Sequence, residues 1–230
     1  MEATAQQRWE LLRTRVDDAC RAAGRSPKDV VVLPVSKTFG PELIREAVGL
    51  GLHRFGENKA QEVKDKSEAL TGCDIDWVMI GHMQRNKVGL VARLAAEVQS
   101  VDRSSVAQAL DRHLHAEGRV IEVLVQVKTS HEPSKFGLDP AALIPFLDEL
   151  AGYPSMRVRG LMTLAVNTGD PAAIRGCFRR LRLLRDAAAA RGHDLPRLSM
   201  GMSSDFGLAI AEGATEVRIG TALFGDRGSR

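Results

Sequence analysis

The chain has 230 residues, of which 44% are hydrophobic and 27% are charged, and its formal net charge is +3. This is the composition of an ordinary globular protein with ample apolar material for one core, so we expect a single domain over residues 1–230. The small net charge disfavours nucleic acid as a partner, and no run approaches the ~20 apolar residues of a membrane span.

Strand-like and helix-like segments alternate along the chain. We predict a first helix over 4–23, and further helices over 41–50, from about 58, and over 86–96, 104–116, 140–151, 171–191 and 205–212. We predict strands near 30–36, 52–55, 76–80, 97–101, 120–127, 157–162, 197–200 and 216–219. Eight strands alternating with helices, plus one helix ahead of the first strand, predict an α/β fold of the (β/α)₈ TIM barrel type. A doubly wound open sheet is the alternative, but eight units and short final strands favour the barrel.

Three other patterns bear on partners and location. Four arginines, at 179, 180, 182 and 185, lie on a periodic helix beside apolar residues, which favours a solvated helix face over a nucleic-acid patch. The three widely spaced cysteines form neither a disulfide framework nor a CxxC metal motif. The first eight residues lack the apolar core of a secretory signal. We therefore expect a cytoplasmic protein without a metal, and we expect a monomer.

Lys37 ends an apolar, β-branched run that reads as a buried strand. A charge carried into a low-dielectric barrel costs several kcal/mol unless it is paired or lost. An amine with a depressed pKa at the carboxyl end of a strand suits Schiff-base chemistry with an aldehyde cofactor. The alternative is a lysine whose head reaches water past the strand end.

Glycine and hydroxyl residues follow the seventh and eighth predicted strands, where barrels commonly bind phosphate. Ser203 and Ser204 come after the seventh strand, and Gly220 and Thr221 come after the eighth. Free backbone N–H groups and helix dipoles favour a dianion at such loops. Each loop alone is explained better by simple helix capping. The two loops together, opposite a strand-end lysine, favour a phosphate site.

A lysine and a phosphate cradle at one barrel mouth suggest pyridoxal 5′-phosphate. Arg218 alternates with apolar Val217 and Ile219, so it faces the other side of its strand. If that side is the barrel interior, its guanidinium would reach the pyridine nitrogen. Neutralisation of a carboxylate such as Glu216 or Asp226 explains the arginine equally well. A phosphate-sugar enzyme with an aldolase-type Lys37 is a third interpretation of the site.

Seven segments in collinear order, between about residues 30 and 226, are similar to one family. They are VSKT at 35–38, FGEN at 55–58, IGHMQRNK at 80–87, SKFG at 134–137, RGLM at 159–162, LSMGMSSD at 198–205 and VRIGTALFG at 217–225. On these segments the chain resembles the pyridoxal phosphate homeostasis proteins, also called the proline synthase co-transcribed family.

The resemblance implies a single-domain barrel of the alanine racemase N-terminal type. It implies an internal aldimine of pyridoxal 5′-phosphate on Lys37, with Arg218 facing the ring nitrogen. The other residues that it places at the cofactor are, at the phosphate, Ser203, Ser204, Gly220 and Thr221, and elsewhere Asn58, His82 and Met162.

Five other positions either match the family or depart from it, and none of them is assigned a role at the site. Glu57, Gln61 and Glu62 look like signature residues of the family, but the sequence assigns them no function. Lys59 and Gly40 depart from the family pattern and affect only the rim of the site.

Two functions of different class follow from the resemblance. The first is a carrier without catalytic residues, which buffers the cofactor and passes it to apo-enzymes. The second is a racemase-like enzyme. Arg218 favours the carrier, because a cation beside the ring nitrogen disfavours its protonation and weakens the electron sink. Racemisation also needs a second acid or base. Full alanine racemases take this group, a tyrosine, from a second domain. The one tyrosine of this sequence, Tyr153, precedes the sixth predicted strand and so lies at the end of the barrel away from the site. A partner subunit would therefore have to supply the base.

Overall fold

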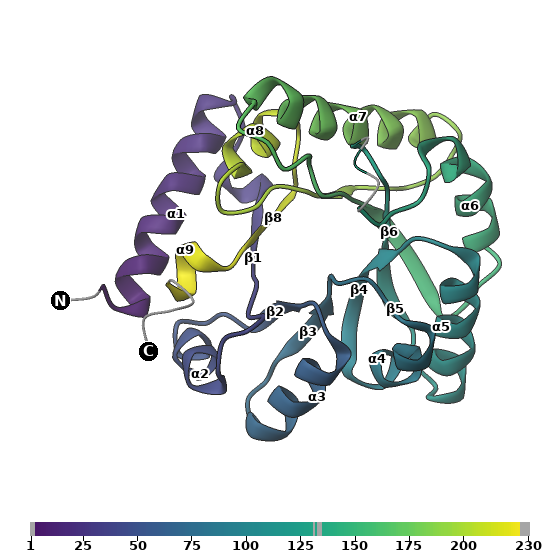
Figure 1. Ribbon diagram of the computed structural model, residues 1–230, viewed down its shortest axis with the longest axis horizontal. Coiled ribbons are helices and arrows are strands. Elements are labelled where there is room, and N and C mark those ends of the chain that lie inside the picture. The colour runs from purple at the N-terminus through teal and green to yellow at the C-terminus, as the bar shows by residue number, and fades with distance from the viewer. Residues whose placement is uncertain (1–2, 131, 133–134, 226–230) are drawn as a thin grey trace.

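The computed structural model describes residues 3–130, 132 and 135–225, and within them eight parallel strands form a ring surrounded by helices (Figure 1). The hydrogen-bonded strand order is β1-β8-β7-β6-β5-β4-β3-β2. The ring is completed between β1 and β2 by a parallel bridge from Val35 to Gly56 and by the Ser36 N–H bond to the Gly56 carbonyl, 3.0 Å long. The predicted (β/α)₈ barrel is confirmed.

The strands are short and the helices between them differ in length. The strands are β1 (Val31–Pro34), β2 (Arg54–Glu57), β3 (Asp76–Met79), β4 (Ala95–Val101), β5 (Ile121–Gln126), β6 (Met156–Met162), β7 (Arg197–Ser199) and β8 (Glu216–Ile219). The α-helices are α1 (Ala5–Ala22), α2 (Pro41–Gly49), α3 (Ala60–Ala69), α4 (Val88–Leu94), α5 (Ser104–Ala116), α6 (Leu143–Leu150), α7 (Pro171–Ala189), α8 (Phe206–Ala211) and α9 (Thr221–Phe224). Short 3₁₀ turns occupy Pro27–Asp29, Arg85–Lys87 and Pro140–Ala142.

Several element boundaries differ from the prediction by a few residues, and two of these differences have a physical explanation. The second strand runs over Arg54–Glu57 rather than 52–55, so a buried carboxylate ends it. The pattern gave no sign of this, because the side chain that neutralises Glu57 lies nine residues further on, at Lys66. The helix expected over 86–96 ends at Leu94, and the next strand starts at Ala95, which pairs with Trp77. Alanine and leucine there fit either element, and strand pairing decides between them.

The helix ahead of the first strand is present and packs against α8 and α9 (Figure 1). A capping box starts it: the Thr4 hydroxyl accepts the Gln7 N–H, and the Gln7 side chain accepts the Thr4 N–H. Its buried face carries Leu12, Val16 and Cys20. None of the helices in the described ranges is both long and apolar enough to cross a membrane.

Two different cores lie on the two sides of the strands. Apolar side chains such as Val123, Val217 and Ile219 fill the layer between strands and helices. The barrel interior, in contrast, holds charge. At the amino-terminal ends of the strands, Arg197 lies 2.8 Å from Glu97 and 2.9 Å from Glu216. Buried ions are tolerated only when they are paired in this way. This ion-pair network therefore closes the bottom of the barrel, opposite the carboxyl ends of the strands.

A matched pair of glycine substitutions tests this packing. In β6 a Cβ on Gly160 would stand 2.0 Å from the Arg197 carbonyl oxygen, whereas a Cβ on Gly176 of α7 would have no neighbour within 4 Å. Gly160→Ala should therefore lower the free energy of unfolding by about 1–3 kcal/mol. Gly176→Ala should raise it by roughly 0.5–1 kcal/mol, because alanine favours the helix. Urea denaturation measures both values, and shifts in the same direction would contradict the packing described.

Candidate functional site

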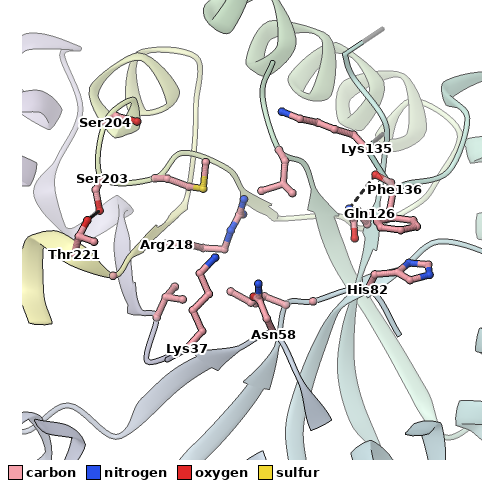
Figure 2. A pocket seen from close by; sticks show the side chains of 16 residues that line it. Lys37, Asn58, His82, Gln126, Lys135, Phe136, Ser203, Ser204, Arg218 and Thr221 are labelled. Atoms are coloured by element: carbon pink, nitrogen blue, oxygen red, sulfur yellow. Dashed lines mark hydrogen bonds between the residues drawn. The ribbon is translucent and has the colours of Figure 1, made fainter. Parts of the chain in front are cut away.

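A cavity of about 630 Å³ opens at the carboxyl ends of the strands. Its wall is built from loops after several different strands, which is the usual place for an active or binding site in this fold. Figure 2 shows Lys37 and Arg218 reaching toward the same part of the cavity. Ser203, Ser204 and Thr221 lie on one side of it.

Lys37 is presented by a tight turn directly after β1. The turn runs from Ser36 to Phe39 and is closed by the Phe39 N–H bond to the Ser36 carbonyl, 3.0 Å long. Ser36 is fully buried, while Lys37 is half-buried at the cavity wall. The lysine thus leaves the barrel wall at the mouth.

Arg218 points into the barrel interior, which is the direction that a contact with a cofactor ring would need. Its guanidinium donates to the Ser199 hydroxyl at 2.8 Å and to the Thr163 carbonyl at 2.7 Å. Burial lowers the pKa of Arg218 to about 10, while the nearby charges of Glu216 and Asp205 oppose that shift. The group therefore stays charged at neutral pH. Ser199 links Arg218 to one of the two carboxylates considered from the sequence, because its hydroxyl also lies 3.1 Å from the Glu216 carboxylate. The other carboxylate, Asp226, falls outside the described residues.

The loops after β7 and β8 bring hydroxyl groups together. Thr221 Oγ1 lies 3.4 Å from Ser203 Oγ, within hydrogen-bonding distance (Figure 2). The backbone N–H groups of Ser203 and Ser204 have no protein partner in the part of the chain that the structure describes. Gly201 allows this close arrangement: its φ is +95°, and a Cβ there would be 2.6 Å from the Ala209 Cβ.

The opposite wall is formed by residues after β2, β3 and β5. The rings of His82 and Phe136 are stacked with their centroids 3.7 Å apart. The Gln126 side-chain amide donates to the Phe136 carbonyl at 3.0 Å (Figure 2). Gln126 Oε1 is buried and has no partner within the described ranges. Asn58 is held close to Gly81, where a Cβ would stand 2.0 Å from the Asn58 carbonyl oxygen.

The structure brings together eight of the nine site residues named from the sequence. Those that line the cavity are Lys37, Asn58, His82, Ser203, Ser204, Arg218, Gly220 and Thr221. Met162 is not among the described lining residues. It is buried at the end of β6, and because Leu161 joins the outer apolar layer, Met162 faces the barrel interior. A cofactor contact from any of the nine residues stays a prediction.

Sequence reasoning missed three polar or aromatic lining residues. Gln126 was visible as a polar residue directly after the buried apolar run 123–125, a signal equal to that of Lys37. Lys135 and Phe136 belong to a segment of the family resemblance, but a loop offers no periodicity from which a direction could be read. Ser134 of that segment lies outside the described residues.

Comparison with known proteins assigns the family. Residues 12–228 match the model described as alanine racemase, N-terminal domain. The chain is 40% identical to a pyridoxal phosphate homeostasis protein of Aquifex aeolicus, over 96% of this chain and 97% of that protein. It is 43% identical to a protein of the same name from Pseudomonas aeruginosa, over 93% and 91% of the two chains. The chain belongs to the pyridoxal phosphate homeostasis protein family.

Solved structures agree with this assignment. PipY of Synechococcus elongatus PCC7942, whose structure was solved with PLP bound, is 35% identical, with a TM-score of 0.82 over 91% of this chain and all of that one. The same protein without PLP gives a TM-score of 0.87. An alanine racemase of Clostridium difficile 630 is 12% identical, with a TM-score of 0.72, and the match covers 92% of this chain but 56% of the racemase. That distant likeness concerns the fold alone.

Proposed function

We propose that this protein binds pyridoxal 5′-phosphate through Lys37 and serves pyridoxal phosphate homeostasis, buffering the cofactor or delivering it to apo-enzymes without notable catalysis. The observation that carries the proposal is one cavity that holds a strand-end lysine, a buried arginine and two hydroxyl-bearing loops. The names of relatives with 40% and 43% identity support the same function. The cofactor supplies an aldehyde that condenses with an amine with loss of water, and Lys37 is the amine at the mouth.

The chemistry of the wall fits the three parts of this cofactor. Ser203, Ser204 and Thr221 offer hydroxyl and backbone N–H donors to a phosphate, and Gly220 lies beside them in the wall. Arg218 offers a fixed cation where a ring nitrogen would accept a hydrogen bond. The unpartnered Gln126 Oε1 in the described structure is an acceptor for a hydroxyl group. We propose these residues, with Asn58, His82 and Met162 near them, as the cofactor site.

The same residues support holding the cofactor rather than using it. A cation beside the ring nitrogen opposes protonation of that nitrogen, which weakens the ring as the electron sink for carbanion chemistry. The wall also offers few groups to move a second proton. Lys135 is paired with Glu132 at 3.0 Å, and His82 is stacked on Phe136. The Tyr153 hydroxyl donates to Glu149 at 2.8 Å, just ahead of β6 at the amino-terminal end of the barrel.

The phosphate cradle makes a first test. Pyridoxal without phosphate should bind much more weakly than the phosphate ester, because the serine and threonine donors lose their anion. Ser204→Ala should weaken binding of the ester about tenfold, the effect of one hydrogen bond to a charged group. Ser67→Ala is a matched control, since its hydroxyl bonds the Val63 carbonyl inside α3. Titration followed by absorbance gives the dissociation constants. Equal affinity for pyridoxal and its phosphate ester would show that these loops do not bind the phosphate.

The absence of notable catalysis makes a second test. Deuterium exchange at the α-carbon of alanine in heavy water should be far slower than enzymatic turnover, while the loaded protein still reactivates an apo-enzyme over time. Both are measured on the same preparation, by NMR and by a coupled transfer assay. Exchange at about 1 s⁻¹ or faster would instead favour a racemase-like enzyme.

A further inference from the structure

The backbone directly after Lys37 is strained. Thr38 has a φ of +69°, and it is the one non-glycine residue in the described structure with a positive φ. It is the third residue of the turn from Ser36 to Phe39, a position where positive φ normally selects glycine or asparagine. A β-branched residue is especially unfavourable there. Such strain persists only where surrounding groups hold it in place.

One of those groups is Glu62, on the first turn of α3. Its Oε2 accepts the Thr38 backbone N–H at 3.0 Å, across 24 residues of sequence. This bond fixes the direction of the peptide that joins Lys37 to Thr38. The strained turn is therefore supported by a neighbouring helix in addition to its own bond from the Phe39 N–H to the Ser36 carbonyl.

The other side of Lys37 is held by the same helix. One turn after Glu62, the Lys66 ammonium donates to the Ser36 carbonyl at 2.8 Å and to Glu57 Oε1 at 2.5 Å. The Ser36 hydroxyl also donates to Glu57 Oε1, at 2.6 Å. Lys66 completes the arrangement by contacting Glu62 Oε2 at 3.3 Å. The residues on both sides of Lys37 are thus attached to one cluster, Glu57–Glu62–Lys66.

Two of the three members of this cluster are buried. Glu57 is fully buried, and the Lys66 side chain is 9% exposed. Burial raises the pKa of Glu57, and its bonds to Lys66 and Ser36 oppose the shift. Burial also opposes ionisation of Glu62, but the Thr38 N–H and Lys66 together hold its pKa below the usual value. Because a buried ion pair is costly to form and costly to break, it is suited to fixing one geometry.

Gln61, the third signature residue without a role, does not belong to the cluster. Its side chain donates to Asp65 on the exposed side of α3, at 2.9 Å. Lys59 approaches Glu62 Oε1 at 3.8 Å from the solvent side. The contacts to the turn therefore come from two of the three signature residues and from Lys66, a residue that the sequence did not single out.

We propose that Glu62 and Lys66, with Glu57, are positioning residues that hold the strained Ser36–Thr38 backbone so that the Lys37 amine meets the cofactor aldehyde. The inference rests on the proposed function and extends it to residues that do not line the cavity. They act through the turn and touch no part of the cofactor. Loss of Glu62 lets Thr38 relax toward negative φ, which moves the amine while leaving the phosphate loops and Arg218 unchanged.

The test compares two ligands on the full chain. Pyridoxal 5′-phosphate reacts with Lys37, whereas pyridoxine 5′-phosphate has an alcohol in place of the aldehyde and reports binding without the covalent bond. Glu62→Ala should weaken binding of pyridoxal 5′-phosphate about tenfold, the effect of one lost hydrogen bond to a charged group. The affinity for pyridoxine 5′-phosphate should stay unchanged. Absorbance titration measures the first affinity, and quenching of protein fluorescence measures the second.

Three further variants separate positioning from support of the fold. Glu68→Ala is the matched control, because Glu68 is an exposed residue of the same helix with only a 3.8 Å pairing to Lys64. Glu62→Gln keeps an oxygen that can accept the Thr38 N–H and should retain more affinity than Glu62→Ala. Thr38→Gly added to Glu62→Ala should recover part of the loss, because glycine adopts positive φ without steric cost. Thermal unfolding of each apo-protein shows that the variants are folded.

The outcomes are distinct. Unchanged affinity for pyridoxal 5′-phosphate in Glu62→Ala overturns the proposal, and so does an equal loss for both phosphate esters, which would indicate general support of the cavity. If the unaltered protein binds the two esters equally and forms no adduct on Lys37, the proposed function fails before any variant is needed.

Discussion

The structure depends on a charge held inside the barrel. Arg218 is 4% exposed, in a space that most barrels of this type fill with branched apolar side chains. Ser199 and the Thr163 carbonyl accept its hydrogen bonds, and Glu216 balances its charge from below. Glu216 is in turn held by Arg197 at the barrel floor. Without this chain of partners a buried guanidinium would cost far more than a small domain can supply.

This arrangement gives the mouth its particular chemistry. A fixed cation sits under the cavity, a lysine leaves the wall at the first strand, and hydroxyl groups gather after the last two strands. These groups suit an aldehyde with a ring nitrogen and a phosphate. In the proposed complex the same cation would disfavour protonation of the ring nitrogen and so weaken the ring as an electron sink. The shared fold with a racemase at 12% identity is therefore compatible with a different use of the same barrel.

The part of the cavity wall that carries Lys37 is also attached to the surrounding helices. The turn that carries Lys37 is joined to α3 through Glu62 and Lys66, so the position of the amine is set by a helix outside the barrel. The cluster is small, but it connects both neighbours of the lysine. The barrel and its surrounding helices thus contribute separately: the interior fixes the cation, and the outer layer fixes the amine.

The sequence predicted the barrel because alternation of strands and helices is a local pattern repeated eight times. It also predicted Lys37 at the mouth, since parallel strands in a barrel end at the same side. The strand pattern left the direction of Arg218 open, and only the family resemblance placed that residue at the site. It did not predict the cluster around Lys37. Glu57 stood out only as a signature residue without a role, and Lys66 did not stand out at all. Only the contact between β2, α3 and the turn after β1 gives them a role. Gln126 and Phe136 were missed for a related reason, because their contact joins a strand end to an irregular loop.

Attachment of the cofactor to Lys37 is the central claim, and chemical reduction tests it most directly. The protein is loaded with pyridoxal 5′-phosphate, treated with borohydride, digested and mapped by mass spectrometry. The account predicts that the reduced phosphopyridoxyl group lies on Lys37 and that the native complex absorbs visible light before reduction. A reduced group found mainly on another lysine, such as Lys59 or Lys135, would contradict it.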